Sequence, residues 1–167
     1  MTDPLQRRTM PLRSANKNFF LEQWNRVKRW KCRCDKKPDL DFYEAFFINA
    51  YHLKDWLEQW YEKNPSYASS ASILNTAFSE KVYLKILKDI CNGSKHFTLH
   101  KKPAISRQYV IVNEYVSENT GRKVVLIGCN KYPLVDLAND IYNYWENYLT
   151  DSKLIKLKNE ISGPLIP

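Results

Sequence analysis

Glycine is scarce in this sequence, with only 4 among 167 residues. A glycine-rich phosphate-binding loop and a β-sandwich with many tight turns both need more glycine, so the composition disfavours both classes. No stretch approaches the roughly 20 consecutive apolar residues that span a bilayer. The basic N-terminus is not followed by the apolar segment of a secretory signal. We therefore expect a cytoplasmic protein that does not insert into a membrane.

Cysteine and histidine are also few. The 4 cysteines are expected as reduced thiols in a cytoplasmic protein. Cys32 and Cys34 form a C-x-C pair, but the second close pair typical of structural zinc sites is absent from the sequence. We therefore expect neither a metal nor another cofactor. The 3 histidines limit histidine-based chemistry to His52, His96 and His100, and no Walker, Rossmann, G-x-S-x-G or H-E-x-x-H motif occurs.

Hydrophobic and aromatic residues, by contrast, are plentiful. They make up 44% and 14% of the sequence, which is enough for one well-packed core in a chain of this length. Residues 1–15 hold two prolines and two adjacent arginines without any periodicity. We expect a flexible basic arm over 1–15 and a single domain over 16–167.

Positive charge is concentrated near the N-terminus. Residues 1–37 contain 11 Lys or Arg and 3 Asp or Glu, whereas the rest of the chain contains 15 of each sign. A local excess of positive charge attracts phosphate backbones, so RNA or another nucleic acid is one predicted partner. The other interpretation is a solvated basic helix that only aids solubility. The residues predicted to bind nucleic acid are Arg26, Arg29, Arg33, Lys36 and Lys37.

Hydrophobic periodicity predicts a mainly α fold. The expected architecture is an antiparallel four-helix bundle with a β-hairpin between the third and fourth helices. The helices are expected over residues 17–34, 39–63, 79–92 and 132–149. Residues 68–77 are expected to form a connector or a short helix. Alternating β-rich residues predict hairpin strands over 108–116 and 122–128.

Asn49 interrupts the apolar stripe of the second expected helix. That stripe consists of Phe42, Phe46, Asn49, Leu53, Trp56 and Trp60. A buried amide must find hydrogen-bond partners. One interpretation is structural: Asn49 fixes the register of two helices, as single buried asparagines do in bundles, and His52 packs at the seam. In the other, His52 assists a reaction from this helix.

A second polar segment closes the third expected helix. Asp89, Asn92 and His96 follow each other at i, i+3 and i+7. A helix that continues through Gly93 places them on one face, which we expect to meet solvent or a dimer partner. His96 can serve as an acid–base near neutral pH, and Lys95 can hold a phosphate. Alternatively, Asn92 and Gly93 stop the helix, and Lys95 and His96 sit favourably at its negative end.

These two segments together resemble a known family. The segment FINAYHLKDW over 47–56, followed by DICNGSKH over 89–96 and a β-hairpin, resembles a family of small bacterial proteins and covers about residues 40–130. That resemblance implies no particular activity. More distantly, the expected order of helices and motifs is similar to that of HEPN domains, which are four-helix bundles. Many HEPN domains are dimeric ribonucleases of toxin–antitoxin and phage-defence systems. Their motif, R-N-x-x-x-H, is matched here by Asn92 and His96, with Cys91 in the arginine position.

The HEPN resemblance implies a homodimeric RNA-binding protein or metal-independent ribonuclease. His96 would be the acid–base, Asn92 and Lys95 would bind the phosphate, and His52 would assist. Cys91 departs from the motif, because the arginine is the expected stabiliser of the anionic transition state. The alternative is a non-catalytic interaction module, in which Asn49, His52, Asn92 and His96 form one buried polar network.

Overall fold

The computed structural model describes residues 19–95, 109–117, 120–127, 129–152 and 154. The predicted arm over residues 1–15 lies outside this part. The described part is mainly α, as predicted, with five α-helices: α1 (Phe19–Lys36), α2 (Leu40–Glu62), α3 (Ala68–Glu80), α4 (Val82–Lys95) and α5 (Leu134–Asp151). A short 3-10 helix, η1 (Pro65–Tyr67), joins α2 to α3. The strands are β1 (Tyr109–Ser117), β2 (Thr120–Ile127) and β3 (Asn130–Pro133).

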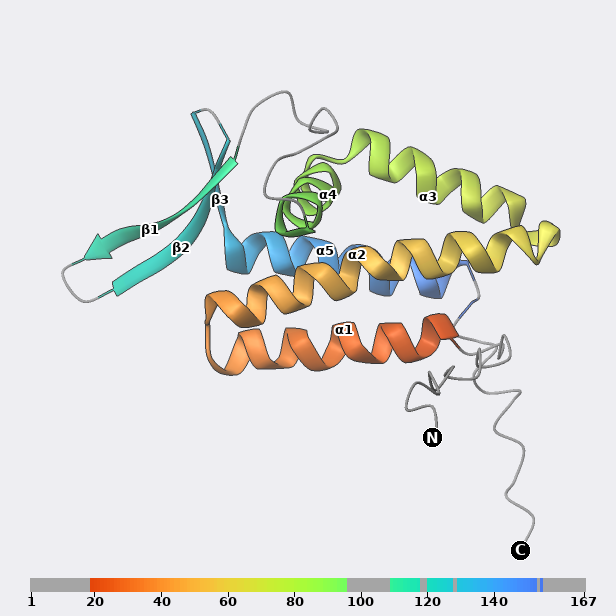
Figure 1. The fold of residues 1–167 in the computed structure, drawn as a ribbon, viewed down its shortest axis with the longest axis horizontal. Coiled ribbons are helices and arrows are strands. Elements are labelled where there is room, and N and C mark those ends of the chain that lie inside the picture. The colour runs from red at the N-terminus through yellow and green to blue at the C-terminus, as the bar shows by residue number, and fades with distance from the viewer. Residues whose placement is uncertain (1–18, 96–108, 118–119, 128, 153, 155–167) are drawn as a thin grey trace, which may run out of the picture.

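Four of the helices extend along the long axis of the molecule, and one crosses them. Figure 1 shows α1 and α2 as an antiparallel pair, with α5 behind α2 and α3 on the side opposite α1. It shows α4 nearly end-on, because α4 runs across the others, and the sheet at one end of the helices. The predicted count of four helices is therefore wrong, since the third predicted helix corresponds to parts of two.

The first two helices begin and pack as their sequences indicate. Phe20, Trp24 and Val27 are buried, and Trp30, which continues their helical spacing, is half-buried. Asp39 is the N-cap of α2, and its side chain accepts a hydrogen bond from the backbone N–H of Asp41 at 3.1 Å. This bond satisfies one of the N–H groups that a helix start leaves without a partner.

The core-facing side of α2 overlaps the predicted stripe only at Phe46 and Leu53. Its buried residues are Tyr43, Phe46, Phe47, Ala50, Leu53, Leu57 and Tyr61. The stripe members Phe42, Asn49, Trp56 and Trp60 are half-buried. They face α1, where Trp56 stacks on Phe19 with ring centroids 4.6 Å apart. The heptad spacing thus marks the seam between α1 and α2, and the core lies about a quarter-turn further round.

The region predicted as one helix from residue 79 is divided at Lys81. Lys81 has an extended backbone with ψ of 123°, and it separates α3 from α4. Its N–H still donates to the carbonyl of Ala77 at 2.9 Å, which closes the last turn of α3. The small-residue segment 68–77 therefore belongs to a full helix. Gly93 does not end α4, which continues to Lys95.

The β-hairpin is confirmed and carries one strand more than predicted. β1 and β2 pair antiparallel with Tyr109 opposite Ile127, and β2 also pairs with β3, with Val125 opposite Tyr132. Val124 and Val125 are buried, which attaches β2 to the helices. Pro133 caps α5 from outside instead of standing in its first turn.

The last helix closes the core with the residues that its periodicity predicts. Leu134, Leu137, Ala138, Ile141, Trp145 and Tyr148 are all buried. The Tyr148 hydroxyl donates to the carbonyl of Ser70 at 2.7 Å and lies 2.6 Å from the Tyr61 hydroxyl, so one buried polar contact joins α2, α3 and α5. Among the helices that the structure describes, none combines the length and the apolar character needed to cross a bilayer.

Candidate nucleic-acid interface

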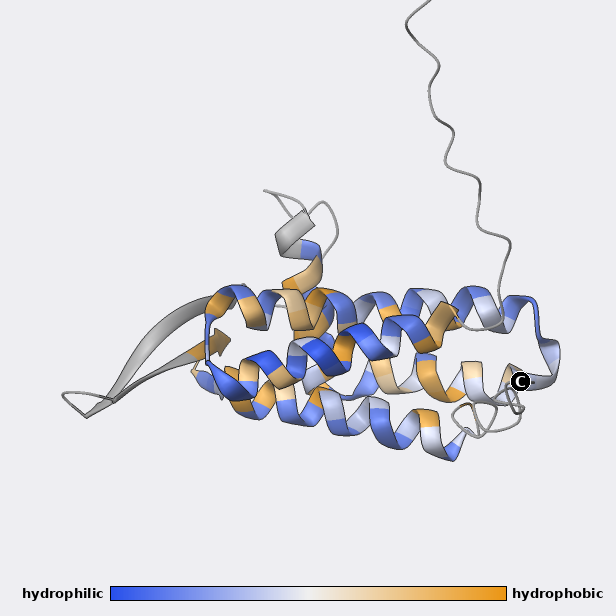
Figure 2. Cartoon of the chain, turned by 90° about the horizontal axis from the view of Figure 1, so that it is seen from below, coloured by the Kyte–Doolittle hydropathy of each residue, from blue (hydrophilic) through white to orange (hydrophobic). Residues whose placement is uncertain are grey.

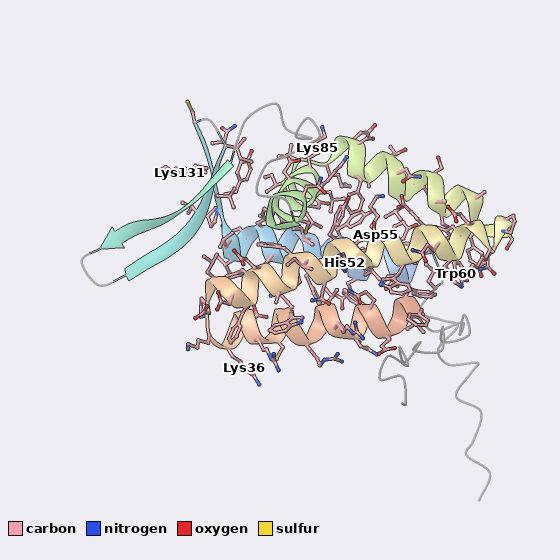
Figure 3. The ribbon with its side chains drawn as sticks, in the orientation of Figure 1. Lys36, His52, Asp55, Trp60, Lys85 and Lys131 are labelled. Atoms are coloured by element: carbon pink, nitrogen blue, oxygen red, sulfur yellow. The ribbon has the colours of Figure 1, made fainter. Side chains whose placement is uncertain are left out.

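The outer face of α1 carries the residues predicted to bind nucleic acid. All five are exposed: Arg26, Arg29, Arg33, Lys36 and Lys37, here called the basic stripe. At 100° per residue, the first four fall within about 80° of the helix circumference. Figure 3 shows Lys36 on the side of α1 that points away from α2. Figure 2, which views the molecule from below, colours much of this helix as hydrophilic.

The rotation of α1 is fixed by its inner side. Trp24 contacts Tyr142 of α5 with ring centroids 5.2 Å apart, and Phe20 contacts Trp60 of α2 at 5.5 Å. Val27, one turn beyond Trp24, is fully buried as well. Because buried aromatic side chains contribute several kcal/mol each, the helix has no low-energy rotation that turns the basic stripe inward.

Acidic side chains neutralise only a small part of the basic stripe. Arg26 pairs with Glu22 at 3.3 Å, and both side chains are about half exposed, so this ion pair is weak. Lys31 binds Asp35 at 2.6 Å, on a different side of the helix. Within the described part of the chain, no ion pair joins Arg29, Lys36 or Lys37 to a carboxylate. The basic stripe therefore presents a surplus of positive charge to solvent.

One member of the basic stripe also contacts aromatic rings. The guanidinium carbon of Arg33 lies 4.4 Å from the ring centroid of Trp30. Trp30 is half-buried and packs against Phe42 of α2 with ring centroids 6.1 Å apart. This arrangement joins a cation to an aromatic pair at the edge of the seam between α1 and α2.

The predicted catalytic segment lies at the end of α4, and part of it is in the core. Asp89 is only 3% exposed, so the prediction that its face meets solvent or a dimer partner is wrong for this residue. Cys91 is fully buried, and its thiol donates to the carbonyl of Phe47 at 3.3 Å. Asn92 is half-buried. The side chain of Lys95 and the whole of His96 lie outside the described part, so their roles stay predictions.

The other predicted polar residues lie on different sides of α2. The side-chain N–H of Gln23 donates to the side-chain oxygen of Asn49 at 3.1 Å and to its carbonyl at 2.8 Å. Asn49 in turn donates to the carbonyl of Ala45 at 2.7 Å. The buried Gln23 and the half-buried Asn49 therefore link α1 to α2, which is the kind of contact that the structural interpretation of Asn49 predicts.

His52 is half-buried on α2, where Figure 3 labels it near the middle of the helix. Its neighbour Tyr51 packs on Phe78 of α3, with ring centroids 6.2 Å apart. Because consecutive helical residues point about 100° apart, His52 projects away from the side of α2 that carries Tyr51 and Phe47, the side that α3 and α4 contact.

The C-x-C pair places its two thiols on different sides of α1. Cys32 is exposed, whereas Cys34 is buried. Burial, helped by the neighbouring Asp35 carboxylate, raises the pKa of the Cys34 thiol to about 11. A thiol that stays protonated is a poor metal ligand. Among the residues that the structure describes, no three or more His, Cys, Asp or Glu side chains gather into a metal-binding group.

No protein-family model, curated protein or solved structure matches this chain. The resemblance to HEPN domains therefore stays a prediction, and any assignment of function rests on the residues themselves. Two relevant features escaped the sequence interpretation. Gln23 lies three residues after Phe20, a spacing that marks it as a partner at the helix seam. Trp30 and Arg33 are also three residues apart, a spacing at which side chains meet on a helix surface.

Proposed function

We propose that this chain binds RNA through the basic stripe on α1. The observation that carries the proposal is a row of five exposed cations on a helix whose inner side is locked into the core, with one weak ion pair among them. Such a row gains affinity by releasing counterions from a phosphate backbone. The similarity to HEPN domains favours RNA over DNA and suggests a bacterial defence or toxin–antitoxin setting, with a homodimer as the proposed assembly.

The length of the basic stripe sets its expected salt dependence. The eleven residues from Arg26 to Lys36 span ten steps of helical rise, or about 15 Å. At about 3.4 Å of helical rise per phosphate of one strand, the stripe faces roughly four phosphates. The logarithm of the affinity for a single strand should therefore fall with the logarithm of the salt concentration with a slope of about −3.

Two variants of equal charge test the proposal. The first replaces Arg29, Lys36 and Lys37 with alanine, and the second replaces Lys63, Lys81 and Lys88, which are also exposed but lie on the other helices and loops. Both lower the net charge by the same amount. In a filter-binding or fluorescence-anisotropy titration at low salt, the first variant should lose at least tenfold in RNA affinity and the second less than threefold, because only the first removes aligned phosphate contacts.

The solubility interpretation predicts different results. If the wild-type protein does not bind RNA at low salt, or if both variants lose affinity equally, the basic stripe is not an RNA-binding surface. Ribonuclease activity is a separate proposal. It rests on Asn92, Lys95 and His96 at the end of α4, and loss of RNA binding by the basic stripe does not decide it.

A further inference from the structure

Arg33 differs from the other members of the basic stripe in its orientation. Its guanidinium lies over the indole of Trp30, 4.4 Å from the ring centroid, while the residue as a whole remains exposed. A guanidinium is planar and stacks on aromatic faces, whereas an ammonium is a compact point charge. The contact places the Arg33 guanidinium against Trp30 on one side, and the exposure of the residue leaves another side towards solvent.

Trp30 is itself held in place. It is half-buried, and its ring packs against Phe42, which belongs to the first turn of α2. The rings of Trp30 and Phe42 have centroids 6.1 Å apart, within the range of favourable aromatic pairs. Arg33 thus rests on a support that belongs to the core, and part of the entropy needed to order a long side chain is lost on folding rather than on binding.

Cations flank Arg33 along the chain. Lys36 and Lys37 follow it, and the backbone N–H of Lys37 donates to the carbonyl of Arg33 at 2.9 Å, which keeps the chain helical to this point. Lys37 therefore lies about one helical turn beyond Arg33. A flat surface beside exposed ammonium groups offers one contact for a nucleobase and others for the adjoining phosphates.

We propose that Arg33, supported by Trp30, is a stacking platform for an unpaired base, and that the basic stripe consequently prefers single-stranded RNA to duplex RNA. This inference rests on the proposed RNA binding and specifies its ligand. Unpaired bases stack on aromatic side chains and on arginine planes, whereas the bases of an A-form duplex are already stacked on each other. A surface that acts through charge alone has no such preference.

A pair of charge-conserving variants separates stacking from charge. Arg33→Lys keeps the positive charge but removes the planar group, and Arg29→Lys makes the same change on the same stripe at a residue with no described aromatic contact. The probes are an adenylate-rich RNA strand of about 12 nucleotides, within the usual site size of single-strand binders, and the duplex it forms with its complement. Affinity is measured by fluorescence anisotropy, and folding of each variant is checked by thermal unfolding.

The stacking platform predicts a selective loss. Arg33→Lys should weaken binding of the single strand by about fivefold or more, as expected for losing one stacked base. It should change duplex binding by less than about twofold, whereas Arg29→Lys should change the affinities for strand and duplex by the same factor, because Arg29 contributes charge alone. Equal effects of the two variants, or equal affinity of the wild-type protein for strand and duplex, would overturn the platform while leaving RNA binding intact. Absence of binding to both probes would overturn the proposed function as well.

Discussion

The outer face of α1 and the C-terminal half of α4 began as similar signals, namely polar residues recurring at helical spacing, and the structure treats them differently. On the outer face of α1 the five residues of the basic stripe are all exposed. On α4, Asp89 and Cys91 are buried, together with Leu84, Ile86, Leu87 and Ile90 on the remaining sides. Helical spacing thus shows which residues share a face, but whether that face meets solvent depends on where the helix lies in the fold.

The position of each helix explains the difference. α1 lies at the edge of the molecule and contacts α2 and α5 with one side only, whereas α4 crosses the other helices (Figure 1). Residue type adds to this effect. Lysine and arginine are rarely buried without a partner, so a row of them identifies its own face as solvated. A single aspartate or cysteine does not identify a solvated face, because a paired aspartate can be buried and cysteine is often buried.

The largest effect that distinguishes the two regions is expected from Cys91→Arg, which restores the arginine of the HEPN motif. Cys91 is fully buried and its thiol donates to the carbonyl of Phe47. An arginine there both overfills the core and buries a charge, so we expect a loss of more than about 4 kcal/mol in the free energy of unfolding, or no folding at all. Chemical denaturation followed by circular dichroism measures it.

The matched variant on α1 is Arg29→Ala, which removes an exposed arginine with no described ion pair. Its expected effect on the free energy of unfolding lies within about 0.5 kcal/mol. Near-native stability of Cys91→Arg would show that the end of α4 opens readily. Cys91 would then not be the core residue described above.

Alkaline pH should lower the stability of the protein through Tyr51, which lies on the inner side of α2 rather than on the outer face of α1. Burial raises the pKa of Tyr51 to about 12, with smaller contributions from Asp55 and Cys91. In the unfolded chain this phenol ionises near pH 10. Above that pH the unfolded state therefore holds fewer protons than the folded state, and stability falls as the pH rises towards 12.

Thermal unfolding between about pH 9 and 11.5 measures this fall. Burial also raises the pKa of Tyr144 and Tyr148, so Tyr51→Phe should reduce the slope without abolishing it. The slope of the unfolding temperature against pH reports ionisation, whereas the unfolding temperature at a single pH also reports the change in packing, so the slopes of the two proteins are compared. An unchanged slope in Tyr51→Phe would mean that the phenol of Tyr51 is accessible to water in the folded protein.

Much of the fold was predictable because the apolar residues of the sequence recur at clear helical and strand spacings. The apolar positions of α1 and α5, the Asp39 cap of α2 and the two strands of the hairpin all follow from local spacing. The break at Lys81 was not predictable, because neither glycine nor proline marks it. β3 is only four residues long and includes Pro133, so it offers too little alternation to recognise.

The candidate site was predictable in composition but not in arrangement. All five residues of the basic stripe were identified from charge and spacing, and all five are exposed. The stacking of Arg33 on Trp30 depends on rotamers, and on Phe42, which supports Trp30 from another helix. The pairing of Gln23 with Asn49 likewise depends on the register of α1 against α2. Local spacing does not encode contacts of this kind, because both partners must first be placed by the core.

A small effect on stability is also expected from His96→Ala, one residue beyond the described end of α4. His96 completes the N-x-x-x-H spacing with Asn92 and follows Lys95, so an acid–base and a cation for the phosphate stand next to each other in the sequence. If this segment is catalytic, the substitution should abolish RNA cleavage, or toxicity on overexpression. It should change the free energy of unfolding by less than about 1 kcal/mol, as is usual at a surface.

The comparison between the two regions sharpens this experiment, because the basic stripe on α1 supplies an independent readout. If His96 is catalytic, His96→Ala should still bind RNA with the salt dependence of the wild type but should no longer cleave it. His100→Ala, the control at a second histidine, should bind and cleave RNA as the wild type does. If His96 instead belongs to a buried network, the substitution should lower the stability of the protein. Removing it then leaves its partners unsatisfied and costs about 1–3 kcal/mol. A variant that unfolds early, from a parent with no cleavage activity, would extend to His96 the structural role that burial already gives Asp89 and Cys91.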